Sequence, residues 1–84
     1  MRIPRDISGA KLTKSLEALG YKVTRQVGSH MRLTTSLGGQ HHVTVPNHNP
    51  IRVGTLSAIL GRIAQHHQME KADLIKHSLD SIFL

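Results

Sequence analysis

The chain has 84 residues, 38% of them hydrophobic, so it can build one compact core and has little room for a second domain. It contains no cysteine, which excludes disulfide frameworks and thiolate metal sites, and Tyr21 and Phe83 are its only Tyr, Phe or Trp residues, which argues against a base-stacking platform. The formal net charge is +6 and no apolar run approaches the roughly 20 residues that span a bilayer, so we expect a cytoplasmic protein with no membrane partner.

The first predicted element is a helix from Gly9 to Leu19. Ser8 is a favourable N-cap residue, and leucines recur at helical spacing behind it, at positions 12, 16 and 19. Gly20 marks the end, because glycine commonly follows the last turn of a helix. One face of this helix is therefore expected to pack against the core.

Three strands are predicted next, over residues 21–27, 30–35 and 41–46. Strict alternation puts four side chains of the first strand on one face: Tyr21, Val23, Arg25 and Val27. The strands are separated by Gly28-Ser29 and by a glycine-rich turn over residues 36–40. Pro46 ends the third strand, and residues 47–50 are expected to form a loop.

A second helix is predicted from Val53 toward Gln65, because four apolar residues recur at helical spacing: Leu56, Ile59, Leu60 and Ile63. A short third helix from Glu70 to about Leu79 and an apolar tail over residues 80–84 follow. This order favours an α+β two-layer sandwich of the α-β-β-β-α kind found in double-stranded-RNA-binding domains, with a short extra C-terminal helix. We expect a single domain over residues 1–84, with its core at about 8–65 and the C-terminal helix and tail at about 69–84.

Acidic residues are missing from the middle of the chain. There is none between Glu17 and Glu70, whereas Lys, Arg and His are frequent there. An acid-free basic body favours a polyanionic partner through phosphate neutralisation, although an acidic protein surface remains compatible with it. The candidates for RNA phosphate binding are Lys22, Arg25 and Arg32 on the strands, with Lys11 and Lys14 on the first helix in second place.

Histidine is the residue type that offers catalysis, because the body has no carboxylate pair for acid–base work or two-metal binding and no phosphate-cradling glycine motif. His41 and His42 are neighbours on a strand and face opposite ways. His66 and His67 lie about 100° apart around a helix axis, so neither pair suits chelation. We interpret these four and His77 as solvent-exposed and expect no metal and no cofactor.

His30 differs because it follows Gly28-Ser29, where one strand bends into the next, on the face that carries Arg32. Histidine can take a proton from a ribose 2′-hydroxyl or give one to the departing 5′-oxygen, since its reference pKa is about 6.5. Neighbouring cations can stabilise the charge of the phosphorane-like transition state. Such chemistry requires RNA, because DNA lacks the 2′-hydroxyl.

Four blocks stand in order between residue 8 and about residue 65. They are Ser8-Gly9-x-Lys11-Leu12 through Leu16-Glu17-x-Leu19-Gly20-Tyr21, then Gly28-Ser29-His30, Val43-Thr44-Val45-Pro46-Asn47-His48 and Gly54-Thr55-Leu56-x-x-Ile59-Leu60. These blocks resemble the HicA (YcfA-like) toxins of bacterial and archaeal toxin–antitoxin systems.

The resemblance implies a double-stranded-RNA-binding-like fold and a type II toxin, namely a ribosome-independent endoribonuclease that cleaves mRNA. It also implies a HicB-type antitoxin that binds the toxin and masks its active histidine, and it is compatible with an oligomer in that complex. By motif position the catalytic residue is His30, and Gly28 and Ser29 form the turn that presents it. We expect this nuclease to be metal-independent.

The residues leave two other functions open. One is a non-catalytic RNA-binding module of the same fold that recognises duplex shape through phosphates and 2′-hydroxyls. The other is an interaction module whose basic face serves an acidic protein. Cleavage of single-stranded RNA would separate the first from the nuclease, and binding that survives high salt would favour the second.

Overall fold

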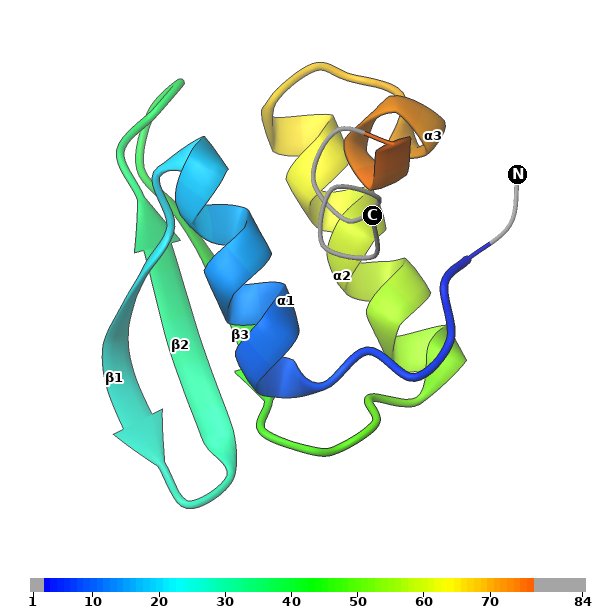
Figure 1. Cartoon of the computed structure of the whole chain (residues 1–84). Helices are drawn as coiled ribbons and strands as arrows, with labels where there is room; N and C mark the ends of the chain where they lie inside the picture. The colour runs from blue at the N-terminus through cyan, green and yellow to red at the C-terminus, as the bar shows by residue number, and fades with distance from the viewer. Residues whose placement is uncertain (1–2, 77–84) are drawn as a thin grey trace.

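The computed structural model describes residues 3–76 (Figure 1). The elements are α1 (Gly9–Leu16), the 3₁₀ turn η1 (Glu17–Leu19), β1 (Lys22–Val27), β2 (His30–Thr35), β3 (His41–Pro46), α2 (Val53–His66) and α3 (Lys71–Leu74). The strands form one antiparallel sheet in the order β1-β2-β3, with α1 and α2 on one side of it. The predicted α+β fold with a short C-terminal helix is confirmed. The remainder of the predicted third helix and the apolar tail lie in residues 77–84, outside the described residues.

The core lies between the sheet and the helices and draws on every layer. Leu12 and Leu16 of α1, Leu33 of β2 and Leu60 of α2 are fully buried, and Leu74 of α3 closes the far end. The apolar stripes read from the sequence therefore all point inward. Each such side chain contributes roughly 1.5–3 kcal/mol by leaving water, which is why the helices stay on this face of the sheet.

Strand β1 contains a bulge at Thr24 that the alternation rule does not anticipate. The β1–β2 register pairs Val23 with Leu33 and then Arg25 with Arg32, so one extra residue stands between them. A bulge of one residue moves all later side chains to the opposite face. Tyr21 and Val23 therefore face the helices, whereas Arg25 and Val27 face away from them, and the prediction that these four share a face is wrong.

The loop after β3 is fastened on two sides. The backbone N–H of Gly9, at the start of α1, donates to His48 O at 2.9 Å, and that of Asn47 donates to Ser29 O at 2.6 Å. Gly9 permits this approach because a Cβ there would lie 2.4 Å from Pro46 O. The turn before β2, the end of β3 and the start of α1 are thus held together at one end of the molecule.

Candidate active site and nucleic-acid interface

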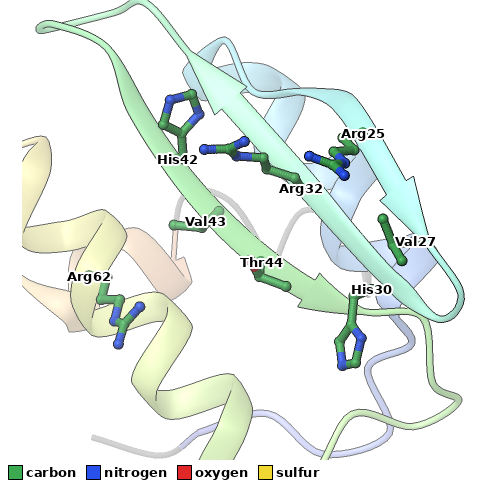
Figure 2. Close-up of a pocket in the computed structure, with 8 residues that line it drawn as sticks. All are labelled: Arg25, Val27, His30, Arg32, His42, Val43, Thr44 and Arg62. Carbon is green, nitrogen blue, oxygen red and sulfur yellow. The ribbon is translucent and has the colours of Figure 1, made fainter.

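The outer face of the sheet, which the helices leave uncovered, carries a shallow basic hollow (Figure 2). Its volume is about 390 Å³, and β1, β2, β3 and α2 all contribute to it. The lining residues are Arg25, Val27, His30, Arg32, His42, Val43, Thr44 and Arg62. No acidic side chain is among them, so the hollow suits an anionic ligand.

His30 is the first residue of β2 and stands exposed at one end of this hollow. The preceding turn places Gly28 at φ 58°, in the left-handed region that glycine adopts without strain. The next residue, Ser29, is held through its carbonyl by Asn47. His30 itself pairs across the sheet with Val27 on one side and Pro46 on the other. The backbone of His30 is therefore held in place by its neighbours, and a polymer can approach the exposed imidazole from solvent.

Two of the predicted phosphate ligands line the same hollow as His30. Arg25 and Arg32 occupy directly opposed positions of β1 and β2 and both line the hollow. Like charges at opposed positions repel, so an anion that binds between these guanidinium groups would relieve the repulsion. The bulge at Thr24 is what brings Arg25 to this face.

The other predicted cations are not part of the hollow. Lys22 pairs with Thr34, so it stands on the outer face, but it does not line the hollow. Lys11 and Lys14 are exposed on α1, in the opposite layer. The structure thus gathers two of the five predicted phosphate ligands around His30.

Two residues of the hollow escaped the sequence reasoning. Arg62 comes from α2, which lies alongside the free edge of β3, and joins the hollow only through tertiary packing. The sequence offers one hint, since Arg62 is an exposed position beside the buried Ile63 of the apolar stripe. His42 is exposed as expected, but it stands in the hollow with its Nδ1 at 2.7 Å from Thr34 Oγ1.

A family model described as the HicA toxin of bacterial toxin–antitoxin systems matches residues 9–74. The chain belongs to this family. It is therefore the toxin of a toxin–antitoxin pair, and an antitoxin is its kind of partner. The match spans the whole hollow, from Arg25 to Arg62. Comparisons with curated proteins and with solved structures gave no match.

The HicA chain also holds three of its histidines in a cluster, which corrects the interpretation of His41, His66 and His67 as solvent-exposed. All three are half-buried, and His77 lies outside the described residues. The rings of His41 and His66 stack with centroids 4.3 Å apart, and His67 meets His66 edge-on at 4.7 Å. The cluster joins β3 to the C-terminus of α2.

Tyr21 is the buried centre of this cluster. Its hydroxyl lies 2.7 Å from His41 Nδ1 and 3.2 Å from His67 Nε2. A hydroxyl donates only one proton, so at least one of these imidazoles donates to Tyr21. Burial raises the pKa of Tyr21 to about 12. Tyr21 thereby ties the start of β1 to both β3 and α2.

Burial also lowers the pKa of two histidines of the cluster, His41 and His67. It is the main cause that lowers the pKa of His41, with further lowering by positive charge on four neighbours: His66, His67, His42 and Arg62. The pKa of His67 is lowered by burial first and by His66 second. His41 and His67 are therefore less readily protonated than a free imidazole, which suits a structural contact.

His66 fastens the turn between β2 and β3. Its Nε2 lies 3.0 Å from Leu37 O and 3.1 Å from Gly39 O, and because carbonyls only accept, Nε2 carries the proton and donates to both.

Within residues 3–76, no three His, Asp or Glu side chains converge as a set of metal ligands. Every helix in the same range falls short of the length and apolarity that crossing a bilayer requires.

Proposed function

We propose that this HicA-family toxin is a ribosome-independent endoribonuclease that cleaves mRNA, with His30 as the proton-transfer residue. The observation that carries the proposal is the exposure of His30 at one end of an acid-free hollow that the opposed Arg25 and Arg32 also line. An RNA strand can reach the imidazole from solvent without any rearrangement of the core. The guanidinium group of Arg25 suits the phosphate that must lie in the hollow with His30.

The reaction is transesterification within the RNA. The 2′-oxygen attacks phosphorus and the bond to the 5′-oxygen breaks, which leaves a 2′,3′-cyclic phosphate and a 5′-hydroxyl. His30 takes the 2′-hydroxyl proton as general base or protonates the leaving 5′-oxygen as general acid, and water takes part in the other transfer. Arg25 stabilises the extra negative charge on the pentacoordinate phosphorus. The scheme needs no metal ion.

The test compares the wild type with His30→Ala and with Lys76→Gln, which removes one exposed positive charge on the α3 side. Because His30 is exposed, His30→Ala should keep the fold and the affinity for RNA, whereas loss of the acid or base should slow cleavage by about 10² to 10⁴-fold. Lys76→Gln should cleave like the wild type. Undiminished cleavage by His30→Ala would remove this residue from the mechanism.

Two further arms define the reaction. An RNA with a single 2′-deoxy sugar at the cleavage site should bind and stay intact, because the internal nucleophile is missing. Addition of EDTA should leave the rate unchanged, and abolition of cleavage by EDTA would point to a metal-dependent reaction. If the wild type leaves single-stranded RNA intact even at high protein concentration, the non-cleaving RNA-binding module becomes the better description.

We also propose that a HicB-type antitoxin neutralises the toxin by covering the basic hollow. The hollow contains His30 and has no acidic side chain in its lining, so an acidic surface that fills it would exclude RNA. Purified antitoxin should therefore displace a fluorescent RNA from His30→Ala in a competitive manner. Simultaneous binding of RNA and antitoxin without mutual effect would contradict this mode of neutralisation.

A further inference from the structure

The hollow extends well beyond the place where His30 acts. His30 pairs with Pro46, and His42 stands four residues before Pro46 on β3, so the two histidines are about 13 Å apart along the sheet at a rise of roughly 3.3 Å per residue. A general acid or base must come within about 3.2 Å of the atom that it serves. His42 therefore cannot share one phosphodiester with His30, although both line the same hollow (Figure 2).

A chain of hydroxyl groups fixes the orientation of His42. Thr24 Oγ1 donates to Arg32 O at 3.3 Å and lies 2.8 Å from Thr34 Oγ1, which in turn lies 2.7 Å from His42 Nδ1. Each hydroxyl has one proton, and that of Thr24 goes to a carbonyl, so Thr34 donates to Thr24 and His42 Nδ1–H donates to Thr34. Nε2 is then the ring nitrogen of His42 that a ligand can reach, and it donates to a phosphate oxygen when both ring nitrogens carry a proton.

Positive charge surrounds this second end of the hollow. Arg32 extends toward His42 from the neighbouring strand, and Arg62 lines the hollow from α2, across the free edge of β3. Both Arg62 and His42 lie near enough to His41 for their positive charge to lower the pKa of that residue. The hollow here therefore offers the guanidinium group of Arg32 beside His42 and that of Arg62 across the edge of β3. With His42 as an imidazolium, which donates from both ring nitrogens, these N–H groups match the oxygens of a phosphate.

We propose that His42 and Arg62, with Arg32, form a second phosphate subsite, which binds the RNA strand a few nucleotides away from the bond that His30 cleaves. The inference rests on the proposed nuclease function and adds a substrate requirement to it. A stacked strand rises roughly 3.4 Å per nucleotide, so 13 Å corresponds to about four nucleotides, and to fewer if the strand is extended. The preferred substrate is then a single strand several nucleotides long and not a dinucleotide.

The experiment uses RNA oligomers with one ribose at a defined linkage and 2′-O-methyl groups elsewhere, so that only this linkage can react. The oligomers grow from two to eight nucleotides, in one series on the 5′ side and in another on the 3′ side. The readout is the ratio of kcat/KM for each length to kcat/KM for the dinucleotide. Wild type, His42→Gln, Arg62→Gln and the charge-matched control Lys76→Gln are compared.

For the wild type the ratio should rise in one of the two series once the added phosphates reach the subsite. A charge-assisted hydrogen bond to phosphate that is lost in His42→Gln or Arg62→Gln should lower this ratio about tenfold. Lys76→Gln should keep the ratio of the wild type. All four proteins should give the same circular dichroism spectrum and Tm within a few degrees, because the substituted side chains are exposed.

The failure of this inference is distinct from failure of the nuclease. If the wild type cleaves but its ratio stays flat, or if both variants slow all lengths equally, the second subsite is wrong and His30 catalysis stands. If nothing is cleaved, fully 2′-O-methylated oligomers still test the subsite by fluorescence anisotropy. Affinity should then rise with length in the wild type and rise less in His42→Gln and Arg62→Gln, and identical length dependence in all proteins would overturn the subsite.

Discussion

Gly9→Ala should be among the most damaging single methyl additions in this protein. A Cβ at Gly9 would lie 2.4 Å from Pro46 O and 2.9 Å from Asn47 Cα, both of them backbone atoms that no side-chain rotation can move away. The same substitution at Gly61 meets nothing within 4 Å. The two variants therefore make the same chemical change in opposite surroundings.

The magnitudes follow from those surroundings. Overpacking against a fixed backbone costs about 1–3 kcal/mol, and since Pro46 O must retreat by roughly 1 Å to reach an ordinary contact distance, Gly9→Ala belongs in the upper part of that range. Gly61 lies inside α2, where alanine is favoured over glycine by about 1 kcal/mol. For a chain of this length each kcal/mol shifts Tm by about 4–8 °C. Gly9→Ala should lower Tm by about 10 °C and Gly61→Ala should raise it by about 5 °C.

The assay is thermal unfolding followed by circular dichroism, with RNA cleavage measured at a temperature where all variants are folded. Gly9→Ala should also slow cleavage, because the displaced Pro46 is the cross-strand partner of His30. Gly61→Ala should cleave at the wild-type rate. The reasoning is refuted if the two variants shift Tm in the same direction, or if Gly9→Ala stays within 1–2 °C of the wild type.

Three further changes test the contacts of Tyr21, the buried histidines and the N-cap of α1. Tyr21→Phe should cost about 1–3 kcal/mol in chemical denaturation, because His41 and His67 each lose a hydrogen-bond partner; a change below about 0.5 kcal/mol would mean that water replaces the hydroxyl. Because the pKa values of His41 and His67 are lowered in the folded state, the unfolded chain binds more protons at acidic pH. The free energy of unfolding should therefore be highest above about pH 6.5 and fall as the pH drops through the folded pKa values. The fall should be less steep in His67→Gln. Ser8→Ala should cost about 1 kcal/mol, because its Oγ accepts from Lys11 N at 3.1 Å, whereas Ser8→Asp should keep the cap; equal losses in both would show that the cap is not the cause.

The helices and strands were predictable because the energetics that shape them are local or periodic. The leucine spacing of α1 and the stripe of α2 report which face is buried, and Gly28-Ser29 marks the turn before His30. The missing acids between Glu17 and Glu70 also signal a hollow without negative charge, whatever its shape. These features can be predicted from the sequence because each depends on residues that are close together in the chain.

The rest depends on contacts between distant residues. The bulge at Thr24 reverses the facing of Arg25, and an alternating pattern contains no sign of it. The joining of Tyr21 to His41 and His67 links positions separated by 20 and 46 residues. A histidine near the end of a helix reads as exposed unless the packing of that end is known. Such placements are decided by the tertiary fold, which single-sequence patterns do not encode.

Repulsion between the opposed Arg25 and Arg32 makes the free toxin less stable than the same fold with an anion bound between these two side chains. A polyanion that binds in the hollow stabilises the folded state over the unfolded state, so its binding should raise the Tm of the toxin. A short inert oligonucleotide, or an antitoxin fragment of the right charge, should register in this way before any turnover is measured. The melting temperature of the toxin therefore reports whether a ligand occupies the basic hollow.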